Sequence, residues 1–124
     1  MEERLQFDIP WLVPPKTSKE FWRLEHDWTL VFRGEYYHLP AGTPTDGASI
    51  PRWLWWLCGT PFDCPRLYAA LVHDWLYDGG DSDATRADAD DLYRDIQIEL
   101  GVSRIKAYAE WLALRLFGRS HWQK

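Results

Sequence analysis

The segment from Pro40 to Arg52, PAGTPTDGASIPR, divides the chain into two halves with different hydrophobic patterns. It concentrates Pro, Gly, Asp, Thr and Ser, the residues that tight turns and special backbone angles require. The half before it is rich in aromatic and β-branched residues, as strands are, whereas the half after it repeats apolar residues at helical spacing. The sequence therefore predicts an α+β fold, in which an N-terminal β-hairpin or small antiparallel sheet and a turn-rich loop precede three C-terminal helices.

The length of 124 residues is that of one domain, which can bury a core without disulfide bonds. We expect residues 1–20, which contain three prolines, to form an extended arm with little regular structure. Residues 21–52 hold the predicted hairpin, with its turn at Arg33-Gly34-Glu35, and the TDGASIPR loop. Residues 53–124 form the predicted helical part, in which WLWWLC is a candidate for a short helix.

The helical part carries start and stop signals for each helix. Pro65 suits the first position of the helix RLYAALVHDWLY, which is apolar nearly all round and is therefore predicted to be central and buried. Thr85 and Asp88 resemble a capping box for the next helix, and Ser103 is the predicted cap of a third. Apolar residues recur on one side of that third helix, at Ile105, Tyr108, Ala109, Leu112 and Leu116.

Charge and composition exclude several classes of protein. The formal net charge of −5 and the scattered basic residues argue against a nucleic-acid reader. No apolar run approaches the roughly 20 residues of a membrane span, and the opening MEERLQFDIPWLV lacks the layout of a signal peptide. Cys58 and Cys64 are too few for a structural zinc site and are predicted to be reduced thiols.

Tryptophan is unusually frequent, with nine residues, three of them in the motif RWLWWL. Large amphipathic rings fill small cores, and when exposed they also bind another protein or a lipid surface. Both interpretations stay open from the sequence.

His73 lies in the apolar helix segment AALVHDWLY, where an imidazole without a hydrogen-bond partner would be costly. Tyr77 lies four residues later on the same face. The loop to the next helix is short, so the two helices are predicted to run antiparallel. Arg86 and Asp90, also four residues apart, would then lie at the edge of the core within reach of His73, whereas Asp91 is predicted to point to solvent.

A histidine oriented by a carboxylate from another element is typical of a general base. The same arrangement is typical of a buried polar network that fixes how two helices pack. Asp74, beside His73, and Asp46 and Ser49 in the adjoining loop belong to the candidate site under either interpretation.

Four motifs in order resemble the bacterial and phage family known as domain of unknown function 1353: TDGASIPRWLW, AALVHDWLYD, RADADDLYRDIQIELGV and AYAEWLALRLFG with Trp122. The resemblance covers roughly residues 40–122. It implies a phage or prophage origin and an α+β fold, and it brings no established activity. The signature positions in this sequence are Asp46, Ser49, Ile50, Pro51, Arg52, His73, Asp74, Tyr77, Arg86, Ala89 and Asp90.

The motif HDWLY also resembles the HDxxY helix of secreted calcium-dependent phospholipases. That resemblance implies that His73 is the base that activates water, that Asp74 binds the metal and that Asp90 orients the histidine. The glycine-rich calcium loop and the disulfide framework of those enzymes have no counterpart in this sequence. Asp46 and the TDGAS loop would have to take the place of that loop.

Two functions follow as hypotheses, and whether the chain is an enzyme stays open between them. The first is a phage- or prophage-encoded virion component or binder of a host protein, located in the cytoplasm of the infected bacterium or in the virion. Its Asp/His/Asp cluster would fix the fold or form a binding pocket, and its partner would be a protein. The second is a small metal-assisted hydrolase, with calcium or zinc as the possible divalent cation. The catalytic candidates are His73, Asp74, Asp46 and Asp90, and the binding candidates are Ser49, Arg52, Tyr77 and Arg86.

Overall fold

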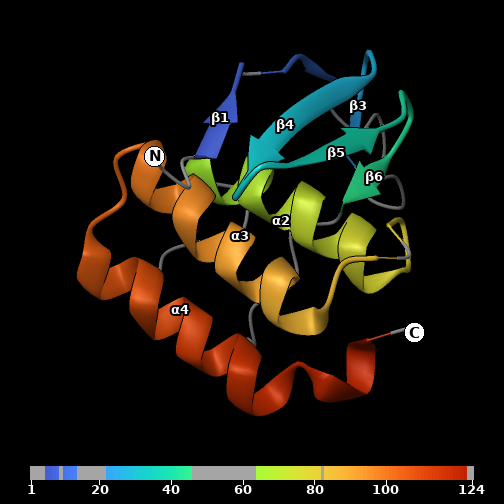
Figure 1. Ribbon diagram of the computed structural model, residues 1–124. Coiled ribbons are helices and arrows are strands. Elements are labelled where there is room, and N and C mark those ends of the chain that lie inside the picture. The colour runs from blue at the N-terminus through green and yellow to red at the C-terminus, as the bar shows by residue number, and fades with distance from the viewer. Residues whose placement is uncertain (1–4, 9, 14–21, 46–63, 82, 123–124) are drawn as a thin grey trace.

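The computed structural model describes residues 5–8, 10–13, 22–45, 64–81 and 83–122 (Figure 1). Strands occupy the N-terminal half, and three helices follow, which confirms the predicted α+β class. The strands lie on one side of the molecule (Figure 1). The helix α2 (Cys64–Tyr77) packs beneath them, and α3 (Arg86–Glu99) and then α4 (Arg104–Phe117) follow on the side away from the strands.

The first sheet has the strand order β1-β4-β5, in which β1 is Leu5–Phe7, and it is antiparallel throughout. Its centre is the predicted hairpin, β4 (Trp28–Phe32) joined to β5 (Glu35–Leu39). Arg33 and Gly34 form the turn with positive φ angles of 55° and 80°. Two successive positive φ angles give a turn whose twist matches that of the strands, so the hairpin closes in two residues.

The N-terminal arm contributes two strands, so the prediction of little regular structure there is wrong. β1 (Leu5–Phe7) pairs with β4, and β2 (Leu12–Val13) pairs with β3 (Trp22–Leu24), which also pairs with β6 (Pro44–Thr45) in a second sheet. β1 and β2, with three and two residues, are too short to give a periodic strand signal of their own. Their backbone groups are satisfied by partners far along the chain, which local patterns do not reveal.

The helices α3 (Arg86–Glu99) and α4 (Arg104–Phe117) begin directly after their predicted caps, Thr85 and Ser103. The helix α2 (Cys64–Tyr77) begins one residue before the predicted first position, Pro65, and a 3₁₀ helix, η2 (Arg119–His121), follows α4. The Thr85 hydroxyl accepts from the backbone NH of Asp88, and the Asp88 carboxylate accepts from the backbone NH of Thr85. The Ser103 hydroxyl accepts from the backbone NH of Lys106. The candidate short helix WLWWLC lies outside the described residues.

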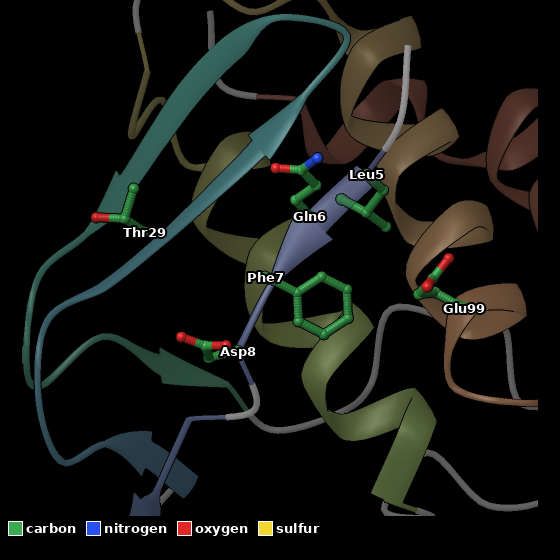
Figure 2. A pocket seen from close by; sticks show the side chains of 6 residues that line it. All are labelled: Leu5, Gln6, Phe7, Asp8, Thr29 and Glu99. Carbon is green, nitrogen blue, oxygen red and sulfur yellow. The ribbon is translucent and has the colours of Figure 1, made fainter. Parts of the chain in front are cut away.

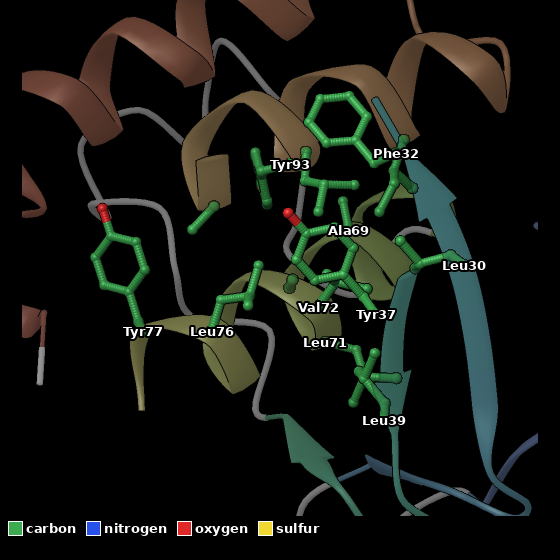
Figure 3. Packing of buried hydrophobic residues seen from close by; sticks show 14 of the residues in the cluster. Leu30, Phe32, Tyr37, Leu39, Ala69, Leu71, Val72, Leu76, Tyr77 and Tyr93 are labelled. Carbon is green, nitrogen blue, oxygen red and sulfur yellow. The ribbon is translucent and has the colours of Figure 1, made fainter. Parts of the chain in front are cut away.

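The core lies between the hairpin and α2, with α3 closing its far side (Figure 3). Leu30 and Leu39 point from the hairpin towards Leu71 of α2, and all three are fully buried. The prediction that this helix is buried is confirmed, and the buried positions of α2 include Leu67, Ala70, Leu71 and Leu76. α2 is therefore the central helix, and its C-terminal half positions His73.

α4 buries a face that its apolar pattern does not predict. The buried positions are Ala107, Glu110, Ala113 and Leu114. The apolar side identified from the sequence is instead exposed to solvent over much of its length, with 83% of Ile105, 44% of Tyr108, 50% of Leu112 and 63% of Leu116 accessible. An apolar helix side normally faces the core. In α4 the opposite face is buried instead, and it contains Glu110, whose carboxylate accepts hydrogen bonds inside the protein.

Candidate functional site

The centre of the site is a contact between α2 and α3. His73 Nε2 lies 2.9 Å from Asp90 Oδ1, and the Tyr77 hydroxyl donates to the same oxygen at 2.6 Å. Only 3% of His73 is exposed and Asp90 is fully buried. The structure thus brings together three of the residues selected by helical spacing, because α2 and α3 pack antiparallel with one turn of each in register.

The second carboxylate oxygen of Asp90 is held by arginines. Arg115 of α4 donates to Oδ2 at 2.9 Å, and Arg86 Nε lies 3.9 Å from it. Arg86 Nε also donates to the Tyr77 hydroxyl at 3.0 Å, and its Nη2 donates to the backbone carbonyls of Leu114 and Arg115. One carboxylate therefore ties α2, α3 and α4 together.

Arg115 is a site residue that the sequence analysis missed. It lies 25 residues from Asp90 and on a third helix, so no spacing rule connects the two. The need for such a residue can be inferred only once Asp90 is known to be buried, because a buried carboxylate beside one histidine requires further donors or cations.

The ionisation of the cluster follows from these contacts. Burial by itself would raise the pKa of Asp90, but the hydrogen bonds from His73, Tyr77 and Arg115 outweigh it and hold that pKa below its ordinary value. Burial raises the pKa of Tyr77, and the hydrogen bond that Tyr77 donates to the Asp90 carboxylate raises it further. At neutral pH, Asp90 is therefore an anion that accepts, and Tyr77 is a neutral phenol that donates.

The two ring nitrogens of His73 differ. Since Asp90 is ionised, Nε2 carries the proton that it donates, and in the neutral ring Nδ1 keeps its lone pair. Nδ1 is buried and has no hydrogen-bond partner among the residues that the structure describes. The rings of Tyr77 and Tyr93 lie against the imidazole, with centroids 4.0 Å and 5.3 Å away. An unpaired buried nitrogen costs roughly 1–3 kcal/mol.

Asp74 is next to His73 in the chain, and its side chain contacts the end of a strand. The Thr45 hydroxyl, at the end of β6, donates to Asp74 Oδ2 at 2.5 Å. Thr45 directly precedes the predicted Asp46, but Asp46, Ser49 and Arg52 lie outside the described residues. The convergence of Asp46 with His73 stays a prediction.

No group of three or more His, Cys, Asp or Glu side chains within the described ranges could hold a metal ion. Among those ranges, Asp74 is the carboxylate that the phospholipase resemblance assigns to a cation, and it is already hydrogen-bonded to Thr45. The described residues therefore do not by themselves fit a calcium or zinc site. That prediction depends on Asp46.

Asp91 was predicted to point to solvent, and this is wrong. Its carboxylate lies 3.1 Å from the Arg33 guanidinium and accepts from the Trp111 indole at 2.9 Å, which leaves 18% of the side chain exposed. The turn of the β4–β5 hairpin brings Arg33 over α3. Helical periodicity alone cannot predict this placement.

A second buried cluster lies next to the first. Glu110 accepts from Arg66 at 2.8 Å, from the Tyr93 hydroxyl at 2.8 Å and from Gln97 at 3.0 Å. Tyr93 also meets the ring of His73 edge-on, so the two clusters touch. Glu110 and Arg66 neutralise each other, and all four side chains of this second cluster are buried. This cluster fixes the packing of the same three helices.

A hollow of about 520 Å³ lies beside β1 (Figure 2). Its lining residues are Leu5, Gln6, Phe7, Asp8, Thr29 and Glu99. None of the predicted site residues belongs to this lining. Two carboxylates in an open hollow do not make a site, so the His73–Asp90 cluster remains the candidate.

Comparison with known proteins confirms the family resemblance. Residues 22–114 match the model of the family described as "Protein of unknown function (DUF1353)". The chain belongs to this family. The DUF1353 match contains His73, Tyr77, Arg86 and Asp90 and ends one residue before Arg115.

The uncharacterized protein y4jT of Sinorhizobium fredii (strain NBRC 101917 / NGR234) is 32% identical to the chain over 88 residues. The alignment covers 68% of this chain and 25% of that protein, so the chain spans about a quarter of the relative's length. No solved structure matches the chain. None of the helices in the described ranges is long and apolar enough to cross a membrane.

Proposed function

We propose that the chain is a small hydrolase in which His73 activates a water molecule for attack on an ester. The observation that carries the proposal is the asymmetry of the His73 ring. Nε2 is fixed to an ionised carboxylate, whereas Nδ1 has no partner among the described residues. A general base requires this arrangement, because one nitrogen must be oriented and the other must be able to accept a proton.

The contacts also support the division of roles. Nδ1 accepts a proton from water while the resulting hydroxide adds to the ester carbonyl. Asp90 stabilises the imidazolium through Nε2 and is a positioning residue. The tetrahedral intermediate then expels the alkoxide, which takes the proton from Nδ1, and an acid and an alcohol leave. Arg86 and Arg115 offset the charge of Asp90, so it stays ionised through the cycle.

The ester class comes from the resemblance of HDWLY to the phospholipase helix. Tyr77, the last residue of that motif, donates to the same oxygen of Asp90 as His73, so the tyrosine and the histidine of the motif contact one carboxylate. If a divalent cation binds, Asp74 and Asp46 are the residues that would hold it, and it would polarise the carbonyl. Water and ester reach His73 through a local opening of the fold during turnover, since only 3% of His73 is exposed.

The test compares two histidines for hydrolysis of p-nitrophenyl esters and short-chain phospholipids. His73→Asn removes the base, whereas His38→Asn changes an exposed histidine that contacts Thr29. We expect the first change to lower the rate about 100-fold or more and the second to leave it unchanged. Wild-type protein that hydrolyses neither class, or an equal rate in His73→Asn, would refute the proposal.

A second candidate is a phage- or prophage-encoded virion component or binder of a host protein. It is favoured by the cross-linking of three helices through Asp90, which is also what a rigid scaffold for a binding surface requires. Under this function the unpaired Nδ1 is only a cost. His73→Gln and His73→Asn would then change stability, while the ester assay would show no turnover in any variant.

A further inference from the structure

α4 presents an apolar row on the side opposite its buried face. Successive helical residues are rotated by about 100°, so the row lies within an arc of about 80°. We call this row the outer face of α4, and it consists of Ile105, Tyr108, Leu112 and Leu116. Among the described residues these are four of the seven large apolar side chains that are exposed. Scattered apolar residues are ordinary on a surface, but a continuous row of this kind marks a contact.

The exposed charges on α4 and directly after it are of one sign. Residues 104–119 contain four basic side chains and one acidic side chain, in a chain whose formal net charge is −5. The acidic side chain is Glu110, which is fully buried against Arg66. Arg104 lies at one edge of the outer face, Lys106 lies beyond the other and Arg119 follows the helix, and all three are exposed.

The nearest carboxylates on α3 do not reverse this sign. Asp95 is bound to Arg94 at 2.8 Å, and Asp91 lies 3.1 Å from Arg33. The guanidinium of Arg94 lies over the ring of Tyr108, with its carbon 5.0 Å from the centroid. The edge of the outer face next to α3 is therefore lined by paired charges. The excess charge comes from Arg104, Lys106 and Arg119 and is positive.

We propose that the outer face of α4 binds the surface of an anionic lipid membrane. A row of apolar side chains with cations nearby suits the boundary between headgroups and acyl chains, because the apolar side chains enter the acyl-chain region while the cations bind the headgroups. α4 is the outermost helix of the fold (Figure 1). A deformable lipid surface accommodates an exposed helix without a preformed groove.

A second copy of the chain fits this face less well. Pairing α4 with itself, in either direction, would bring Arg104, Lys106 and Arg119 against basic residues of the partner. No exposed carboxylate on the helix is available to balance them, since Glu110 is buried. Like charges across such an interface are unfavourable.

The test is co-sedimentation of the full chain with vesicles, either of phosphatidylcholine alone or with about one third phosphatidylglycerol. We expect binding to the anionic vesicles, which added salt weakens. The double change Leu112→Ser and Leu116→Ser, and separately Lys106→Glu, should each weaken binding about tenfold or more. Tyr36→Ser is the matched control, because Tyr36 is 64% exposed but lies on β5.

All of these positions are exposed, so the variants should keep the wild-type melting temperature, which circular dichroism checks. Equal binding to both kinds of vesicle, or binding that the α4 variants retain, would overturn the proposal. Absence of vesicle binding would overturn it as well, including the case in which the outer face proves to join two copies or to capture an acidic peptide. The measurement involves no turnover, so it is independent of the proposed hydrolase activity.

Discussion

Replacing Asp90 with asparagine separates the contribution of its charge from that of its size. The carboxylate accepts from His73 and Tyr77 at Oδ1 and from Arg115 at Oδ2, all at 2.6–2.9 Å. An asparagine can still accept with its one oxygen, but its NH₂ group would then face the Arg115 guanidinium, which also donates. At least one buried donor loses its partner, and the arginines lose their counter-ion.

The magnitude follows from these losses. Removing one partner from a buried ion pair costs about 3–5 kcal/mol, and the remaining hydrogen bonds of the amide return part of this. We expect Asp90→Asn to lower the free energy of unfolding by about 2–4 kcal/mol, a large share of the roughly 5–15 kcal/mol of an ordinary domain. Asp91→Asn is the matched control, because Asp91 is adjacent and its ion pairs lie nearer the surface. It should cost less than about 1 kcal/mol.

Urea denaturation followed by tryptophan fluorescence measures both variants, and the nine indoles provide a strong signal. The free energy of unfolding should fall with urea concentration at the same slope in both variants. A difference between their midpoints then measures a difference in stability. Equal midpoints for Asp90→Asn and Asp91→Asn would show that the cluster does not hold the three helices together. The description of Asp90 as the central tie would then be wrong.

Three further predictions concern the core, the response to acid and a cap. Leu71→Ala should lower the free energy of unfolding by about 2–5 kcal/mol, whereas Leu112→Ala, on the exposed side of α4, should change it by less than about 0.5 kcal/mol, as thermal melts would show. Because the folded-state pKa of Asp90 is lowered, its contribution is complete above the unfolded pKa of about 4 and is lost as the pH falls further. The stability gap between wild type and Asp90→Asn should therefore narrow from pH 5 towards about pH 2, and a widening gap would contradict the assigned charge. Thr85→Ala removes the capping box of α3 and should lower the free energy of unfolding by about 1 kcal/mol. Urea denaturation measures this, and a midpoint equal to that of the wild type would contradict the cap.

The sequence by itself was sufficient for the features that depend on neighbours within about four residues. The β4–β5 turn, the caps at Thr85 and Ser103 and the burial of α2 are all confirmed. The contact of His73 with Asp90 was also predictable. Two antiparallel helices with a short loop leave few possible pairs, and an imidazole in an apolar segment requires a partner.

Only the tertiary structure decided which face of α4 is buried, that Arg115 completes the cluster and that residues of the N-terminal arm form strands. Each of these depends on partners far away in the chain: Arg66 for Glu110, Asp90 for Arg115 and Phe32 for Leu5. The hydrophobic pattern of α4 favours the opposite face, because periodicity measures apolarity and not the hydrogen bonds that a buried carboxylate gains. Pairing energies between distant segments exist only after the chain has folded, so a local pattern cannot contain them.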